Sequence, residues 1–261
     1  MPVLEPPAEQ ASTVPAPQKT TLLSELFGAV QSLAATVAIA IFVITFAVQA
    51  FQIPSGSMEN TLLVGDYVLV DKVRFGPSGF WKPFIPYRNI ARGDVIVFKY
   101  PVNPAEHFVK RVIGVPGDRI HLMDGKVFVN GVAMQEDYAI YKRRGPSAYR
   151  DNFPNRHFDQ QMTQAWAAEL PDLTRIGDLL VPEGHYFVLG DNRNDSYDSR
   201  YWGLVPRENV IGRPLLIYFS VHQNSDPELA YTADGRIDGF AAHLWHLPEM
   251  PRWKRTFRFV Q

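Results

Sequence analysis

The stretch HFVKRVIGVPGDRIHLMDGKVFVNG, residues 107–131, decides the fold class. Its apolar and β-branched residues form short runs that are separated by Gly, Pro and Asp, a pattern typical of β-strands. Asp124-Gly125 and Asn130-Gly131 are dipeptides that favour two-residue hairpin turns, because the central residues of such turns need a positive φ. The stretch therefore predicts consecutive hairpins in an antiparallel sheet.

The same texture continues on both sides of this stretch, and long amphipathic helices are missing from it. We therefore expect a mostly β fold, with antiparallel sheets. Residues 141–181 differ in composition, and only a short helix is expected there, at Asp159–Leu170. We interpret this segment as a variable subdomain inserted between two parts of one β domain, residues 52–140 and 182–261. The expected strands are Tyr67–Val70, Val95–Tyr100, His107–Val115, Arg119–Leu122, Lys126–Val129, Tyr186–Leu189 and Leu215–Phe219.

An uncharged apolar run precedes the β-rich part of the chain. No residue from Leu26 to Met58 carries a charge. A helix rises ~1.5 Å per residue, so about 20 residues cross a ~30 Å hydrocarbon core, and residues 28–51 supply that length. We therefore predict a transmembrane anchor helix over residues 22–51. The Pro-rich residues 1–21 before it have the composition of a disordered tail.

Two alternatives to a permanent anchor stay open. A buried helix of a soluble protein can be as apolar, although such helices usually keep a polar stripe. A cleaved secretion signal is the second alternative, because Val48 and Ala50 are small residues at the spacing of a cleavage site. The flanking charges do not fix the orientation of the span, since Lys19 is offset by Glu25.

Composition excludes several kinds of site. The 26 basic residues nearly balance the 27 acidic residues, so no overall positive field would attract nucleic acid. The chain has no cysteine, which excludes disulfide bonds, thiolate zinc sites and a cysteine nucleophile. The acidic loop at residues 190–200 resembles a calcium loop only superficially, because Arg193 stands where an oxygen ligand is needed. We expect no metal, no cofactor and no nucleic acid partner.

Three segments carry residue types suited to chemistry. Ser55-Gly56-Ser57 follows the apolar run directly, where the glycine would let a hydroxyl and neighbouring amides face one volume. Lys110 shares the apolar face of its expected strand with Phe108 and Val112, and loss of hydration there would favour the neutral amine, a base. The third segment is the polar loop at residues 190–200, which follows an expected strand and is typical of a functional loop. Each segment also has an ordinary alternative. These are a loop that leaves the membrane, a lysine that reaches past the sheet to water, and a solvated turn.

Taken together, these segments resemble the bacterial type I signal peptidases, also called leader peptidases. The resemblance covers roughly residues 22–140 and 182–219, with the motifs in the family's order, and the C-terminal residues 252–259 resemble the family's closing strand. The motifs are Pro54-Ser55-Gly56-Ser57-Met58 with Thr61-Leu62-Leu63-Val64-Gly65-Asp66, then Arg92-Gly93-Asp94-Val95-Ile96-Val97-Phe98, then Lys110-Arg111-Val112-Ile113-Gly114-Val115-Pro116-Gly117-Asp118, then Gly190 to Arg200.

The resemblance implies a Ser/Lys serine protease. Ser57 would be the nucleophile and Lys110 the general base, a variant of the serine-protease triad. Ser196 would orient the lysine amine, while Ser55 and the amide of Ser57 would form the oxyanion hole. The residues that the resemblance gives a supporting role are Asp191, Arg193, Asp198 and Arg200. Those that it places in the substrate pocket are Ile53, Pro54, Met58, Leu62, Phe108 and Val109.

The resemblance also implies a substrate and a location. Such an enzyme would cut signal peptides from exported preproteins after small residues. It would cross the cytoplasmic membrane once, with residues 1–21 in the cytoplasm and the catalytic domain outside, so that the lipid bilayer and the secretion translocon become partners. Two alternatives stay open: a noncatalytic membrane-tethered β protein, and a related Ser/Lys protease that cuts itself or one dedicated partner.

Overall fold

The computed structural model describes residues 22–75, 88–142, 145–155, 159–222 and 251–260, so the tail expected at residues 1–21 lies outside the described residues. The chain divides into two compact units, residues 1–43 and 44–261. We call the described part of the second unit the β body. The expected fold class, mostly β with one N-terminal apolar helix, is confirmed.

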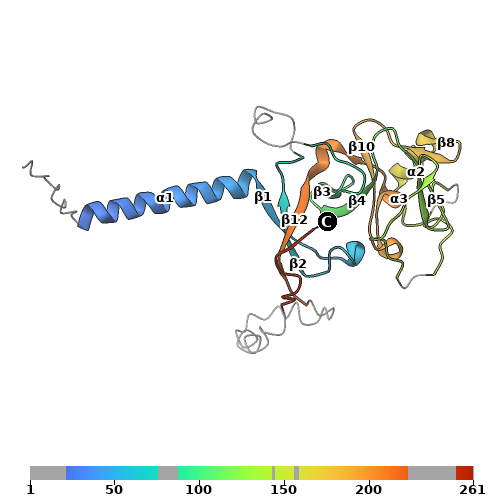
Figure 1. Ribbon diagram of the computed structural model, residues 1–261. Helices are drawn as coiled ribbons and strands as arrows, with labels where there is room; N and C mark the ends of the chain where they lie inside the picture. Colours follow the sequence, from blue (N-terminus) through green and yellow to red (C-terminus); the bar gives the residue numbers. More distant parts are fainter. Residues whose placement is uncertain (1–21, 76–87, 143–144, 156–158, 223–250, 261) are drawn as a thin grey trace, which may run out of the picture. The chain divides into compact units, whose positions relative to one another are not determined.

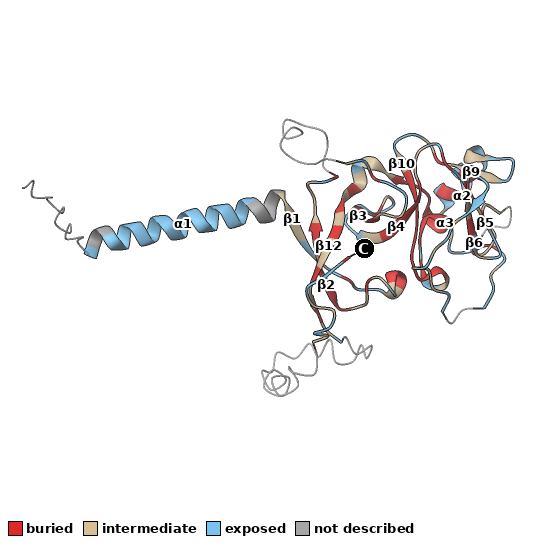
Figure 2. Cartoon of the chain, in the orientation of Figure 1, coloured by how far each residue is buried: buried red, intermediate tan, exposed pale blue. Residues whose placement is uncertain are grey.

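Helix α1 runs from Leu22 to Phe46. Its segment Glu25–Phe42 is long and apolar enough to cross a membrane, and none of that segment is buried in the protein. Figure 2 shows α1 as exposed along its described side chains. This exposure disfavours a buried helix of a soluble protein, since such a helix covers its apolar side chains. A signal sequence has the same properties, so the cleavage alternative stays open.

The helix ends five residues before the anchor boundary that we expect from the sequence. Residues 48–52 form strand β1 (Val48–Gln52), which pairs antiparallel with β2 (Asp66–Asp71) along its whole length. Pairing satisfies the backbone N–H and C=O groups that a helix would otherwise satisfy internally. The β-rich part of the chain therefore begins before residue 52.

Most strands of the β body belong to one eight-stranded sheet (Figure 1). The strand order is β1-β2-β12-β3-β4-β10-β11, and β13 pairs with β12. All of its strand pairs are antiparallel, as the hairpin signals predict. Its strands besides β1 and β2 are β3 (Val95–Lys99), β4 (His107–Gly114), β10 (His185–Leu189), β11 (Val205–Pro206), β12 (Val210–Ser220) and β13 (Arg258–Phe259). The sheet brings β4 between β3 and β10, at the centre of the body.

A smaller five-stranded sheet has the order β7-β6-β5-β9-β8. Three of its strands come from the first part of the β domain: β5 (Arg119–Met123), β6 (Lys126–Val129) and β7 (Val132–Ala133). The other two are β8 (Thr174–Arg175) and β9 (Asp178–Leu180), from the segment that we expected to be inserted. Asp124 and Asn130 adopt the positive φ that their hairpin turns require.

The described residues of the inserted segment share the hydrophobic core of the β body. Strand β9 extends the sheet of β5, and helix α2 (Gln164–Leu173) packs against β8 and β9 (Figure 1). Tyr149, Phe153 and Trp166 are buried in the same hydrophobic cluster as the side chains of β4 and β10. Residues 141–181 are therefore integrated into the β body, because their apolar side chains complete its core.

Candidate active site

The serine motif forms a tight turn rather than a solvated loop. After β1 the chain turns through the 3-10 helix η1 (Gly56–Met58), and the amide of Ile53 donates to the carbonyl of Asp66 at 2.9 Å. This turn leaves Ser55 exposed but buries Ser57, whose exposed fraction is 8%. The Ser57 carbonyl also accepts a hydrogen bond from the Asn192 amide at 3.1 Å, which ties η1 to the loop after β10.

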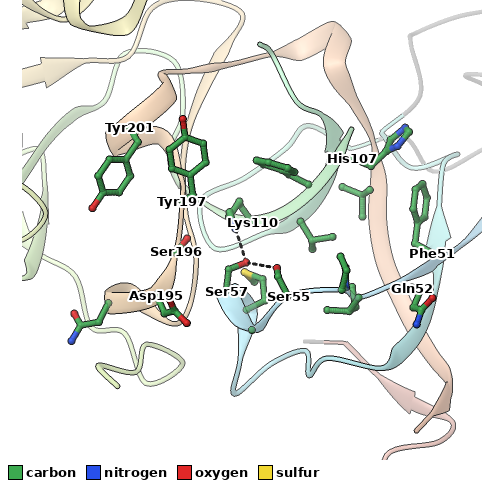
Figure 3. A pocket seen from close by; sticks show the side chains of 18 of the residues that line it. Phe51, Gln52, Ser55, Ser57, His107, Lys110, Asp195, Ser196, Tyr197 and Tyr201 are labelled. Atoms are coloured by element: carbon green, nitrogen blue, oxygen red, sulfur yellow. Dashed lines mark hydrogen bonds between the residues drawn. The ribbon is translucent and has the colours of Figure 1, made fainter. Parts of the chain in front are cut away.

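Lys110 does not reach water. It lies in the central strand β4 and is only 4% exposed. Its amine contacts the hydroxyl of Ser57, with 2.6 Å between Nζ and Oγ. Figure 3 shows Ser57 between Lys110 and Ser55, whose own hydroxyl oxygen lies 3.4 Å from that of Ser57. The structure thus brings Lys110 of β4 into contact with a serine turn that lies 53 positions earlier in the chain.

The surroundings of Lys110 favour the neutral amine. Burial lowers the pKa of Lys110 from 10.5 to about 8, because an ammonium ion in this position loses its hydration. The charges of Asp198 and Asp191 oppose this change, whereas the positive charge of Arg200 adds to it. A lysine with this pKa exchanges protons close to neutral pH and can therefore serve as a base.

Asp198 and Arg200 form a buried ion pair close to the lysine. Two nitrogens of the Arg200 guanidinium donate to the Asp198 carboxylate, both at 2.8 Å. Burial by itself would raise the pKa of Asp198, but the charge and hydrogen bonds of Arg200 hold that pKa below its ordinary value. The Asp198 carboxylate also accepts from the Gly190 amide at 3.1 Å, so the pair fixes both ends of the loop.

Ser196 lies beside the two reactive groups without contacting the lysine. Its hydroxyl is buried, lines the same cavity as Lys110, and makes no hydrogen bond to the lysine amine. The hydroxyl instead faces Asp198, whose pKa it helps to lower. Gly190 allows this approach, because a Cβ at that position would lie 2.3 Å from Ser196 Oγ and 2.5 Å from the Ser57 carbonyl oxygen.

On the other face of β4, Arg111 forms a second buried ion pair. Its guanidinium donates to both carboxylate oxygens of Asp191, at 2.8 and 2.7 Å. The Thr61 hydroxyl also donates to Asp191. A bidentate pair of this kind fixes orientation as well as distance. It therefore links β4 and the segment after η1 to the start of the loop at residues 190–200.

Two residues beside this pair carried no sequence signal. Glu136 receives two hydrogen bonds from Arg193, at 2.7 and 2.6 Å. Tyr138 places its ring 4.0 Å from the Arg111 guanidinium and 6.0 Å from that of Arg193, within the range of cation–π attraction. Sequence reasoning missed both because they lie in an irregular segment with no periodic pattern. No local signal in the sequence could have indicated that Arg193 pairs with a carboxylate 57 positions away.

A cavity of about 490 Å³ opens beside Ser57 and Lys110 (Figure 3). Five of the six residues expected in the substrate pocket line it, and their side chains make its wall largely apolar. Leu62 does not line it, because this residue is fully buried in the hydrophobic core behind Met58. The lining residues that we did not expect are Phe51, Gln52, Val97, His107, Gln161, Asn194, Asp195, Tyr197 and Tyr201.

The arrangement supports nucleophilic catalysis. A hydroxyl within hydrogen-bond distance of an amine that can be neutral is the geometry of an activated nucleophile. Among the residues that the structure describes, no group of three or more His, Cys, Asp or Glu side chains could hold a metal ion.

Comparison with known proteins identifies the family of this chain. Residues 26–219 match the family described as signal peptidase, peptidase S26. Signal peptidase I of Pseudomonas fluorescens is 36% identical over 192 residues, covering 67% of this chain and 66% of that protein. Signal peptidase I of Aquifex aeolicus is 35% identical over 212 residues, covering 69% and 79%. Signal peptidase I of Leptolyngbya laminosa is 34% identical over 226 residues, covering 84% and 89%.

A solved structure of a signal peptidase I from Enterococcus faecalis V583 is 35% identical, covers 48% of this chain and 97% of that chain, and has a TM-score of 0.35. The family match extends from the apolar helix through strand β12 and so includes Ser57, Lys110 and the loop at residues 190–200. This chain therefore belongs to the signal peptidase family, peptidase S26, a family of serine endopeptidases.

Proposed function

We propose that this protein removes N-terminal signal peptides from exported preproteins, with Ser57 as the nucleophile and Lys110 as the general base. The observation that carries the proposal is the 2.6 Å contact between the Ser57 hydroxyl and the Lys110 amine inside the cavity. Family membership supports a serine endopeptidase that acts on signal peptides. The contact supports the assignment of the two roles.

The reaction proceeds through an acyl-enzyme. The neutral amine of Lys110 takes the proton of the Ser57 hydroxyl as Oγ attacks the scissile carbonyl carbon. The tetrahedral intermediate then collapses, the C–N bond breaks, and the Lys110 ammonium returns its proton to the leaving amine. A water molecule subsequently attacks the ester carbonyl, again with Lys110 as the base. This second step releases the signal peptide and regenerates Ser57.

The negative charge of the tetrahedral intermediate needs donors that are already in place. The Ser55 hydroxyl, 3.4 Å from Ser57 Oγ, lies on the exposed side of the nucleophile and fits this role together with the Ser57 amide. Donors aimed at the developing charge contribute more than any other single effect in many acyl transfers. Ser196, buried beside them in the same cavity, is the side chain that we propose orients the Lys110 amine during the reaction.

The cavity favours substrates with small side chains near the scissile bond. Ile53, Met58, Phe108 and Val109 contribute apolar side chains to its wall. A shallow apolar pocket accepts alanine and excludes bulky residues, and this exclusion protects most other polypeptides from cleavage. An extended substrate segment bound here would place alternate side chains in the cavity.

The location follows from the anchor and the substrate. The length and apolar composition of Glu25–Phe42 support a membrane anchor for the catalytic part. We propose that α1 crosses the cytoplasmic membrane once, that residues 1–21 are cytoplasmic, and that the domain formed by residues 52–140 and 182–261 is extracytoplasmic. The bilayer and the secretion translocon are the partners that this placement implies.

Cleavage of a synthetic signal-peptide substrate by the full chain in detergent tests the proposal. Ser57→Ala and Lys110→Arg should each abolish cleavage, because the first removes the nucleophile and the second substitutes a guanidinium that stays protonated. Lys126→Arg, at an exposed position of β6, is the matched control and should cleave normally. Turnover by either dyad variant near the wild-type rate would refute the role assignments.

A dedicated protease with one partner is the alternative that shares this chemistry. A panel of unrelated preproteins separates the two functions. General processing predicts cleavage of most members of the panel, whereas cleavage of only one member would favour the dedicated enzyme.

A further inference from the structure

Helix α3 (Ser199–Trp202) is too short to pair its own backbone N–H and C=O groups in hydrogen bonds. It consists of a single turn, so the carbonyl groups at its C-terminal end have no partner within the helix. Two of these carbonyls, those of Arg200 and Tyr201, are nevertheless paired. Their donors all come from residues 145–173, the segment that we expected to be an insertion.

The Arg200 carbonyl accepts two hydrogen bonds from aromatic side chains of that segment. The Tyr149 hydroxyl is one donor, and the Trp166 indole Nε1 is the other, at 3.2 Å. The Tyr201 carbonyl accepts from the backbone amide of Thr163 at 2.9 Å, just where α2 begins. Tyr149 and Trp166 are 4% and 1% exposed, so water does not compete for either bond.

The Arg200 side chain also contacts this segment. One guanidinium nitrogen donates to the Arg150 carbonyl at 3.2 Å, and another donates to the Arg193 carbonyl at 2.9 Å. The remaining donors engage Asp198. Arg200 is 1% exposed, so its position depends entirely on these partners. Its main chain is therefore held from residues 149–166, and its side chain receives one further contact from that segment, at the Arg150 carbonyl.

Arg200 in turn determines where Asp198 lies relative to the reactive groups. The Asp198 carboxylate binds the Arg200 guanidinium and the Gly190 amide, and its charge acts on Lys110. Gly190 packs against Ser196 and the Ser57 carbonyl. A continuous set of contacts thus leads from the aromatic side chains of the expected insertion to the dyad.

We infer that Tyr149, Arg150 and Trp166 are positioning residues for the cleavage reaction: they hold Arg200, through which they keep Asp198 and the loop at residues 190–200 closed around Lys110. This inference rests on the proposed function. It gives residues 141–181 a role in catalysis that does not require any of the three to contact substrate.

The expected signature is a change in the pH dependence of cleavage. If Arg200 shifts, the loop loosens and water approaches Lys110, so the amine regains hydration and holds its proton to higher pH. Loss of packing alone would instead lower the amount of folded enzyme without moving the pH profile. The two explanations therefore differ in an observable that stability does not affect.

Tyr149→Phe is the sharpest test, because it removes one hydroxyl and keeps the buried ring. The matched control is Tyr141→Phe, since the Tyr141 hydroxyl also donates to a backbone carbonyl, that of Gly125 at 2.9 Å, away from α3. We expect kcat/KM at pH 7 to fall about fivefold in Tyr149→Phe, the factor typical of one lost hydrogen bond, with KM unchanged. The pH midpoint of kcat/KM should move upward in Tyr149→Phe and stay at the wild-type value in Tyr141→Phe.

Trp166→Phe removes the second donor and repeats the test independently, with thermal melts of each variant to confirm folding. A Tyr149→Phe or Trp166→Phe enzyme whose pH profile superimposes on that of the wild type, or is lower by one constant factor at every pH, would overturn the inference. A wild-type profile without a rise near pH 8 would instead refute the proposed function, so the two failures are distinguishable.

Discussion

The amine of Lys110 lies 2.6 Å from the hydroxyl oxygen of Ser57, although the two residues are 53 positions apart in the chain. One comes from the centre of the large sheet and the other from the turn after β1, and both are almost completely buried. A cation would be unfavourable in this position unless it were compensated, and Asp198 already pairs with Arg200. The proximity and the low polarity of the surroundings together make the neutral amine the reactive form.

The pH dependence of cleavage follows from this relationship. Because burial lowers the pKa of Lys110 to about 8, the amine is mostly protonated at pH 6 and mostly neutral at pH 9. We expect kcat/KM to rise about tenfold per pH unit below pH 8 and to level off above it. Initial rates with a synthetic signal-peptide substrate between pH 5 and 10 measure this limb. A rate that does not change from pH 6 to pH 9 would be incompatible with Lys110 as the base.

The Ser55 hydroxyl should contribute to kcat rather than to substrate binding. Ser55→Ala removes a donor for the tetrahedral intermediate, and loss of one such donor typically lowers kcat by about 10²–10³. Ser55→Thr keeps a hydroxyl and serves as the control, with activity closer to the wild type. Steady-state kinetics separate kcat from KM. A Ser55→Ala enzyme within a few fold of the wild-type kcat would remove Ser55 from the oxyanion hole.

Local patterns predicted the strands well. The expected strands Val95–Tyr100 and His107–Val115 correspond to β3 (Val95–Lys99) and β4 (His107–Gly114) within one residue. The sequence pattern places β1 in the helix, because an uncharged apolar run is equally compatible with a membrane span and with a buried strand. The helix expected at Asp159–Leu170 begins later, at Gln164, because Thr163 caps it by accepting from the Trp166 amide.

Long-range pairs in the site could not be read from the sequence. Arg111 and Asp191 are 80 positions apart, and Arg193 and Glu136 are 57 apart, so no local spacing indicates either pair. The resemblance named Asp191 and Arg193 without giving their partners. The prediction that Leu62 lines the substrate pocket was wrong, because an apolar residue beside the serine motif can pack in the core as easily as in the cavity. Tertiary packing decides whether such a residue lies in the core or in the cavity, and no local sequence pattern indicates that packing.

Gly190 should be intolerant of any side chain. The Cβ of alanine would lie 2.3 Å from Ser196 Oγ and 2.5 Å from the Ser57 carbonyl oxygen, and the latter is backbone that cannot rotate away. We expect Gly190→Ala to displace the nucleophile and to lower kcat/KM on the order of 10²-fold. Gly145→Ala is the control, because nothing lies within 4 Å of its added Cβ. Equal activities of the two variants would show that the loop adapts without moving Ser57.

Lys110 should lower the free energy of unfolding of this protein at neutral pH. Its pKa is about 8 in the folded protein and 10.5 in the reference state, so between these values the unfolded chain binds more protons. The free energy of unfolding therefore rises as the pH increases from 8 towards 10.5, and the penalty is fully present below pH 8. Lys110→Met, which fills similar space without a charge, should be more stable than the wild type at pH 7 by up to about 3 kcal/mol.

The stability difference between Lys110→Met and the wild type should shrink as the pH approaches 10, because the wild-type amine then becomes neutral in both states. Denaturant unfolding of the full chain in detergent at pH 7, 8.5 and 10 measures this trend. Lys126→Met, at an exposed position of β6, should show a difference that does not change with pH in this way. If the stability difference for Lys110→Met did not change with pH, the Lys110 amine would be hydrated in the folded protein. Its pKa would then not be lowered by burial, and the argument for a neutral base would fail.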